Sequence, residues 1–257
     1  MKITAIANQK GGVGKTSTCV NFASGLGMLG KKVLLVDMDP QGNSTSGLGI
    51  ERRSLEMSIY ELLVDGAPLA ECVSVTPWKG VSLIPATIDL AGAEIELVSA
   101  MSRETRLKKA LTDAESKYDH IIIDCPPSLG LLTLNSLVAS ESIIIPIQCE
   151  YYALEGLSQL MNTIELVRSH LNSSLVLDGL LLTMYDARTR LSKDVAEEVK
   201  ARFGDKVYKT AIPRNVRISE APSHGMPIQY YDHSSPGTTA YNNFTKEVLK
   251  KWQNKED

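Results

Sequence analysis

The chain has 257 residues, of which 43% are hydrophobic, 22% charged and 5% aromatic, so its composition is that of a globular protein with a mostly aliphatic core. The formal net charge of −3 does not by itself predict nucleic-acid binding, and no apolar run approaches the ~18 residues of a membrane span. The four cysteines form neither a Cys-x-x-Cys pair nor a Cys/His cluster, which argues against zinc or iron–sulfur sites and is consistent with a reducing cytoplasm.

Apolar runs of strand length alternate with helical patterns along the whole chain. The expected strands are residues 3–7, 33–36, 81–84, 120–124, 142–147 and 177–184. The expected helices are residues 16–29, 58–64, 89–100, 103–116, 129–139, 154–170, 192–203 and 238–252. The strand runs are continuously apolar, which indicates strands covered on both faces. We therefore expect one α/β domain over residues 1–257, a doubly wound and mostly parallel sheet with helices on both faces.

The first expected strand runs into residues 10–16, which read KGGVGKT and lead into the first expected helix. Strand, glycine loop and helix form the context of a phosphate-binding loop, in which glycines let backbone N–H groups turn towards a polyphosphate. Lys15 is placed to reach the β- and γ-phosphates, and the Thr16 hydroxyl to bind Mg²⁺. The expected nucleotide-binding residues of this loop are Lys10, Gly11, Gly12, Val13, Gly14, Lys15, Thr16 and Ser17.

The loop departs from the usual P-loop pattern at its beginning. Gln9 stands where that pattern has its first glycine, and a second lysine, Lys10, follows it. Lys10 has two interpretations from the residues alone. It is either a solvated surface charge, the usual environment of a lysine, or a cation that reaches a nucleotide held by another subunit.

Polar residues follow the expected strands, as the position of ligands in parallel sheets requires. Asp124 ends the run HIII, where a carboxylate of a P-loop protein holds Mg²⁺, usually through water. Asp37 and Asp39 follow the run VLLV and face the same side, so one can support the metal and one can orient the attacking water. Residues 40–58, rich in Gly, Ser and Asn, are expected to form a mobile loop near the site.

Four segments together give the chain a close resemblance to the deviant Walker-A ATPases of the ParA/Soj group, which partition chromosomes and plasmids. They read KGGVGKT, VLLVDMDPQGN, IIIDCPPSLG and IPRNVRISEAPSHGMPIQYYD. The resemblance implies that Lys10 crosses to the partner's nucleotide and that Asp39 positions the hydrolytic water. It implies catalytic roles for Lys10, Lys15 and Asp39, metal-site roles for Thr16, Asp37 and Asp124, and adenine contacts for Pro213 and Asn215.

The resemblance also implies a working cycle with ATP and Mg²⁺ as its ligands. ATP would drive two subunits into a face-to-face homodimer that binds DNA without sequence preference. Hydrolysis, slow alone and stimulated by a centromere-binding partner of the ParB type, would undo it. The chain starts directly on the first strand, so we expect no N-terminal helix-turn-helix domain. From the resemblance we also expect a cytoplasmic, nucleoid-associated protein.

The charge distribution agrees with a polyanion-facing surface near the C-terminus. Residues 1–179 carry 14 Lys and Arg against 20 Asp and Glu (net −6), whereas residues 180–257 carry 13 against 10 (net +3). Each cation alone is best read as a solvated surface charge. As a group, the candidates are Arg188, Arg190, Lys193, Lys200, Arg202, Lys206, Lys209, Arg214 and Arg217. By positional resemblance, we favour Arg188 and Arg217 as DNA contacts.

Three other functions share this core and stay open. A MinD-type membrane-cycling ATPase would use the stripe Phe244, Val248, Leu249 and Trp252 as a membrane-surface helix, although packing of that stripe on the sheet is the commoner arrangement. A metabolic P-loop enzyme lacks an acceptor pocket in the sequence pattern, and the paired cluster cysteines of an iron-protein reductase are missing. A non-catalytic scaffold is disfavoured by Asp39.

Overall fold

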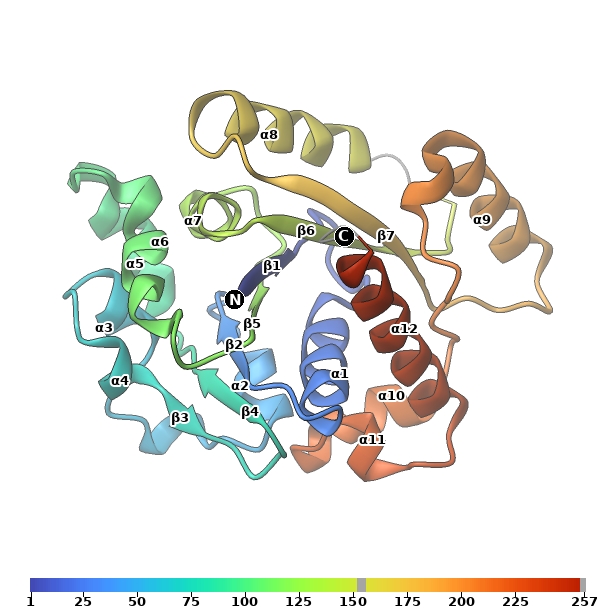
Figure 1. Ribbon diagram of the computed structural model, residues 1–257, viewed down its shortest axis with the longest axis horizontal. Helices are drawn as coiled ribbons and strands as arrows, with labels where there is room; N and C mark the ends of the chain where they lie inside the picture. The colour runs from blue at the N-terminus through green and yellow to red at the C-terminus, as the bar shows by residue number, and fades with distance from the viewer. Residues whose placement is uncertain (152–155, 255–257) are drawn as a thin grey trace.

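A seven-stranded sheet forms the centre of the computed structural model, which describes residues 1–151 and 156–254 (Figure 1). Its order is β3-β4-β2-β5-β1-β6-β7, and every pair is parallel except β3 with β4. The strands are β1 (Lys2–Ile6), β2 (Val33–Asp37), β3 (Ser74–Val75), β4 (Val81–Ile84), β5 (His120–Asp124), β6 (Ser142–Gln148) and β7 (Val176–Thr183). The six predicted strands and the mostly parallel, doubly wound sheet are confirmed, and β3 is the strand that the sequence analysis missed.

Both faces of the sheet are covered, because successive side chains of each strand point to opposite sides. Val33 and Leu35 of β2 belong to one apolar cluster, while Leu34 and Val36 belong to the other. Ile122 of β5 likewise lies opposite its neighbours in the chain. This double burial explains why the strands read as continuous aliphatic runs rather than as alternating ones.

Helices from the two ends of the chain cover one face. There α1 (Lys15–Met28) packs against α12 (Pro236–Gln253), with α11 (Ile228–Tyr231) beside them (Figure 1). The opposite face carries α3 (Ile59–Leu63), α4 (Leu69–Cys72), α5 (Leu90–Glu96), α6 (Arg106–Ala110), α7 (Leu131–Ala139), α8 (Leu157–His170) and α9 (Arg190–Phe203). Two further short helices, α2 (Asn43–Gly47) and α10 (Val216–Glu220), lie in the connections.

The structure differs from the sequence expectation mainly in the short elements. Residues 40–58, expected to be a mobile loop, contain α2 and the 3-10 turn Arg52–Ser54. The expected helix 103–116 is divided into the 3-10 turn Arg103–Thr105, α6 and the 3-10 turn Leu111–Ala114. Of the expected helix 154–170, residues 154 and 155 lie outside the described residues.

The apolar stripe of α12 is part of the core. Phe244 and Val248 are fully buried and Trp252 is 4% exposed, and the Phe244 ring lies 5.2 Å from that of Phe22 in α1. This packing disfavours a membrane-surface role for the stripe. Among the described residues, no helix combines the length and the apolar character that crossing a membrane requires.

Candidate functional site

The glycine loop joins β1 to α1 with the backbone that its sequence predicts. Gly12 and Gly14 have φ values of 73° and 87°, in the left-handed region that disfavours other residues. A Cβ added at Gly11 or Gly12 would meet no atom within 4 Å, so the loop presents bare backbone to open space. Because α1 begins directly at Lys15, its positive end points to the same place, and the loop fits a polyphosphate.

The two lysines of the loop have different environments. Lys15 is 7% exposed, and its ammonium donates to the Lys10 carbonyl at 3.1 Å. Burial lowers the pKa of Lys15, while the nearby Asp124 opposes that shift. The Lys10 side chain is 36% exposed, and its Nζ lies 4.0 Å from Oε2 of Glu150. Lys15 therefore lies inside its own loop, whereas Lys10 stands on the outer rim.

The sheet register places the predicted acids in one row beside this loop. Asp124 of β5 pairs with Ile6 of β1 on one side and with Asp37 of β2 on the other. Both aspartates are fully buried. Burial raises the pKa of Asp37, with the Asp124 charge as the next cause, and burial also raises that of Asp124.

Both oxygens of Asp37 accept hydrogen bonds from the protein. Its Oδ2 accepts hydrogen bonds from the Thr45 backbone N–H at 2.8 Å and the Thr45 hydroxyl at 2.7 Å, and its Oδ1 accepts from the Asp39 N–H at 3.2 Å. The Thr45 hydroxyl in turn accepts from the Ala86 N–H at 2.9 Å. Asp37 thus holds α2 and the backbone of Asp39 in place, so its support for a metal site is indirect.

Asp124 has a hydrogen-bonding position left over. Its Oδ2 accepts from the Ser44 hydroxyl at 2.8 Å, whereas its buried Oδ1 accepts no hydrogen bond from the described residues. The Ser44 and Thr16 hydroxyls both lie close enough to oppose the rise in its pKa. Within residues 1–151 and 156–254, no three His, Cys, Asp or Glu side chains are grouped to hold a metal ion alone. Mg²⁺ fits this arrangement because it is usually bound by one or two carboxylates together with substrate phosphates.

Asp39 lies at the mouth of the same site and is 8% exposed. Its Oδ1 accepts from the Gln41 N–H at 2.9 Å, which fixes the side chain at the start of the turn before α2. By contrast, Oδ2 of Asp39 accepts no hydrogen bond from the described residues. A fixed carboxylate with one open oxygen is suited to orienting water.

The end of β7 links the loop to the predicted adenine segment. The Thr183 hydroxyl donates to the Val13 carbonyl at 2.8 Å, and Tyr185 forms a parallel bridge with Pro213. Asn215 is the N-cap of α10, and its side chain accepts from the Arg217 N–H at 2.9 Å. The structure therefore places Pro213 and Asn215 on the same edge as the loop, and Asn215 already has a local structural role.

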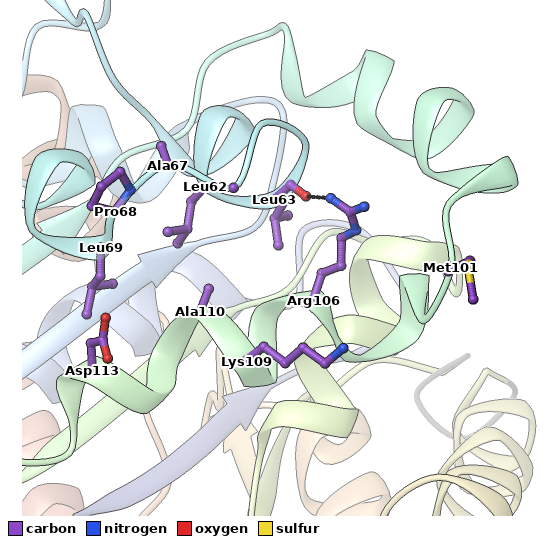
Figure 2. A pocket seen from close by; sticks show the side chains of 11 residues that line it. Leu62, Leu63, Ala67, Pro68, Leu69, Met101, Arg106, Lys109, Ala110 and Asp113 are labelled. Carbon is purple, nitrogen blue, oxygen red and sulfur yellow. Dashed lines mark hydrogen bonds between the residues drawn. The ribbon is translucent and has the colours of Figure 1, made fainter.

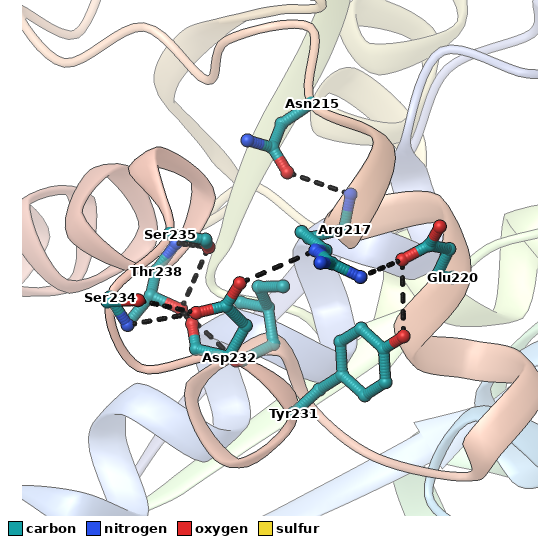
Figure 3. Close-up of polar contacts among 9 residues, drawn as sticks. Asn215, Arg217, Glu220, Tyr231, Asp232, Ser234, Ser235 and Thr238 are labelled. Carbon is teal, nitrogen blue, oxygen red and sulfur yellow. Dashed lines mark hydrogen bonds and ion pairs between the residues drawn. The ribbon is translucent and has the colours of Figure 1, made fainter.

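The two favoured DNA-contacting arginines are both paired with carboxylates. Arg188 makes a bidentate contact to Asp186, at 2.9 Å from Nε and 2.8 Å from Nη2, and hydrogen bonds from Arg188 lower the pKa of Asp186 to about 2. Arg217 lies between Glu220, at 2.8 Å, and Asp232, at 3.5 Å (Figure 3). Their side chains are 88% and 54% exposed, so both guanidinium groups still face solvent.

A cavity of about 390 Å³ lies elsewhere, between α3, α4 and α6 (Figure 2). Leu62, Leu69 and Ala110 form part of its wall, and Arg106 donates from there to the Leu63 carbonyl at 2.8 Å. This hydrogen bond satisfies a carbonyl at the end of α3. No residue of the glycine loop lines the cavity, and we assign it no part in the nucleotide site.

Sequence reasoning did not single out Ser44, Thr45, Thr183 or Glu150 as functional parts of this edge. Ser44 and Thr45 lie in a segment whose composition indicated a loop, and Thr183 lies inside a predicted strand. Glu150 was visible only as one of several polar residues after β6. A strand-end position was the available signal for Thr183 and Glu150.

A glycine loop between β1 and α1, with an acid at the end of the adjacent strand β5, is the architecture of P-loop nucleotide-binding proteins. The additional lysine at the start of the loop places the chain in the deviant Walker-A class of these proteins.

Comparisons with known proteins agree with this class. A family described as an AAA domain matches residues 1–177. The sporulation initiation inhibitor protein Soj of Bacillus subtilis is 62% identical over 96% of the chain and 98% of its own length, and the chromosome partitioning protein ParA of Myxococcus xanthus is 51% identical over 97% and 88%. A solved Mycobacterium smegmatis protein, named cobyrinic acid a,c-diamide synthase and containing an ATP analogue and magnesium, is 40% identical with a TM-score of 0.87, covering 98% of this chain and 96% of that one.

The chain belongs to the ParA/Soj family of chromosome-partitioning ATPases.

Proposed function

We propose that this chain is a DNA-partition ATPase whose ATP-bound form is a homodimer that binds DNA without sequence preference. The observation that carries this proposal is the division between the two loop lysines, one buried at its own phosphate site and one on the outer rim. A cation on the rim can reach a nucleotide in a facing subunit, which a buried one cannot. The name of the 51% identical relative, chromosome partitioning protein ParA, favours partition over the metabolic role in the name of the 40% identical structure.

The roles of the site residues follow from their environments. Gly11 to Gly14 offer backbone N–H groups to the phosphates, Lys15 contacts them from the same subunit, and Thr16 and Asp124 hold Mg²⁺ with Asp37 as support. When bound, Mg²⁺ offsets negative charge on the phosphate oxygens. Asp39 orients the attacking water with the oxygen that Gln41 leaves open.

The partner subunit's Lys10 supplies the contact that couples ATP binding to dimer formation. A contact to the γ-phosphate exists with ATP and is lost with ADP, so ATP favours the dimer by a differential interaction. Hydrolysis removes that interaction from both halves of the interface and releases the subunits. A centromere-binding protein of the ParB type stimulates this slow step.

DNA is bound by the exposed guanidinium groups of Arg188 and Arg217, which have five N–H donors each and retain some after pairing with their carboxylates. Joining two such surfaces in a dimer raises the avidity without any new contact. With this DNA binding, the protein is cytoplasmic and associated with the nucleoid.

The test is DNA binding at several salt concentrations, with no nucleotide, ADP or a non-hydrolysable ATP analogue plus Mg²⁺. We expect tight binding only with the analogue, and a slope of log K against log salt of about −4 to −7 for about four to eight phosphates. Equally tight binding without nucleotide, or binding insensitive to salt, contradicts the proposal.

Two variants test the catalytic roles in the same assay. Asp39→Ala should bind ATP and dimerise but stop turnover, so that the DNA-bound dimer accumulates. Lys10→Ala should still bind ATP. With the non-hydrolysable analogue, however, it should elute as a monomer rather than as a dimer. Normal hydrolysis by the first variant, or normal dimerisation by the second, contradicts the assigned role.

A further inference from the structure

Glu150 lies where three parts of the nucleotide edge meet. It follows the end of β6 by two residues, and the Gln148 amide donates to its Oε1 at 2.6 Å. Oε1 also lies 3.7 Å from Nη2 of Arg214, next to Pro213 in the predicted adenine segment. Its other oxygen, Oε2, lies 4.0 Å from Nζ of Lys10 on the rim of the glycine loop.

The neighbours of Glu150 orient its carboxylate. Gln148 and Arg214 both engage Oε1, which directs Oε2 towards Lys10. The backbone of Lys10 is fixed as well, because its N–H donates to the Asn8 side chain at 2.9 Å and its carbonyl accepts from Lys15 at 3.1 Å. Only the long side chain of Lys10 is left to move.

We propose that Glu150 is a positioning residue that holds the Lys10 ammonium within its own subunit and so opposes dimer formation. This inference rests on the proposed in-trans role of Lys10. One ammonium cannot lie at Oε2 of Glu150 and at a phosphate of the facing subunit at the same time. The ion pair therefore stabilises the separate subunits and is absent from the ATP-bound dimer.

The shared carboxylate makes release of Lys10 easy. When Lys10 leaves, Glu150 keeps its contacts to Gln148 and Arg214, so its charge is not left without partners. The side chains of Lys10 and Glu150 are 36% and 46% exposed, and an exposed pair of this kind is weak and screened by salt. Glu150 thus adjusts the ATP concentration at which dimers form and leaves phosphate binding to Lys15.

The test is the dimer dissociation constant of Glu150→Gln, measured by analytical ultracentrifugation with a non-hydrolysable ATP analogue and Mg²⁺. We expect it to fall by about 2- to 20-fold, because two exposed pairs are lost from the separate subunits for each dimer formed. Nucleotide affinity at protein concentrations too low for dimers should not change. The difference from wild type should shrink between 0.05 and 0.5 M salt, at about the rate expected for screening of exposed charges.

Two further variants separate this role from a general effect of charge. Glu165→Gln removes the same charge from an exposed pair with Arg168 on α8 and should leave the dimer constant unchanged. Glu150→Asp keeps the charge and should lie closer to wild type than Glu150→Gln does.

The outcomes distinguish the two proposals. If wild type dimerises with the analogue and Lys10→Ala does not, but Glu150→Gln dimerises no more tightly than wild type, the role of Glu150 is wrong and the proposed function stands. If wild type does not dimerise, or Lys10→Ala dimerises equally well, both proposals are wrong.

Discussion

Two fully buried aspartates, on strands that β1 and β6 separate, have contrasting surroundings. Asp178 in β7 accepts hydrogen bonds at Oδ2 from Tyr208, at 3.0 Å, and from the Trp252 indole, at 2.7 Å. The Lys251 ammonium lies 3.9 Å from its Oδ1. Asp124 in β5 accepts one hydrogen bond at Oδ2, from the Ser44 hydroxyl, and its buried Oδ1 accepts none from the described residues.

The difference distinguishes a structural carboxylate from one that we propose holds a metal. Lys251 and Trp252 fasten α12 to the sheet through Asp178, and Tyr208 adds a third contact, so the cost of burying the charge is offset within the chain. Asp124 is compensated only in part, because burial raises its pKa although the Ser44, Thr16 and Cys19 side chains oppose the rise. A buried polar atom without a partner is rare, and beside a phosphate loop it is explained by a ligand.

The largest expected effect is on turnover, in Asp124→Asn. Loss of the metal-site carboxylate should lower the ATPase rate by about 10- to 100-fold, as for other groups that support a metal. The unfolding free energy without nucleotide should stay equal or rise, because a poorly compensated buried charge is removed. ATPase assays and urea unfolding check both, and a stability loss of more than about 2 kcal/mol would make Asp124 a structural residue like Asp178.

Asp178→Ala should have the opposite profile. It leaves the buried Tyr208 hydroxyl and Trp252 indole without their acceptor, so we expect the unfolding free energy to fall by about 3 kcal/mol. The midpoint of thermal unfolding should fall by about 6–12 °C. The ATPase rate per folded molecule, measured at low temperature, should remain that of wild type. Loss of turnover without loss of stability would contradict the contrast.

Thr45→Val tests the support beneath the acids. The hydroxyl donates to Asp37 and accepts from Ala86, so its removal should cost about 1–2 kcal/mol of stability. Because Asp37 also holds the backbone of Asp39, turnover should fall more than ATP affinity. Ser46→Ala is the matched control, since its hydroxyl donates only to the Gly42 carbonyl in the same turn.

The smallest effect is a pH dependence of stability at His120, whose ring lies 5.1 Å from that of Trp252 in a tilted arrangement. Burial lowers the pKa of His120 to about 4, and Lys31 adds to the shift. Between pH ~6.5 and ~4 the unfolded chain binds a proton that the folded one excludes, so stability is lost as pH falls through this range. After screening, we expect about 1 kcal/mol. Unfolding free energies measured at several pH values should show a smaller loss of stability on acidification in His120→Gln than in wild type. Above pH 7 the stability of the two proteins should change with pH in the same way.

The sequence predicted the elements that carry strong periodicity or dense motifs. Continuous aliphatic runs identified the six parallel strands, and seven residues of loop predicted a phosphate site. The short helices α2, α4, α10 and α11 have four or five residues each, too few for a helical period to show.

Pairings between distant segments were beyond the sequence. Spacing placed Asp37 and Asp39 on one side but did not divide their roles, whereas the structure shows that two hydrogen bonds from Thr45 occupy Oδ2 of Asp37. The sequence shows that Glu150 follows a predicted strand. Its proximity to Lys10, however, depends on how the loops after β1 and β6 meet. Such contacts are set by tertiary packing, which local patterns do not encode.

Under the proposed DNA-binding role of Arg188, the hydrogen bond from Thr183 to the Val13 carbonyl links the nucleotide site to the DNA site. Thr183 precedes Arg188 by five positions, so the phosphate loop and the guanidinium assigned to DNA share one short stretch of main chain. A shift of the loop by a fraction of an ångström would change the presentation of that arginine directly. Coupling between the bound nucleotide and the proposed DNA contact would then need neither a hinge motion nor the rotation of a domain.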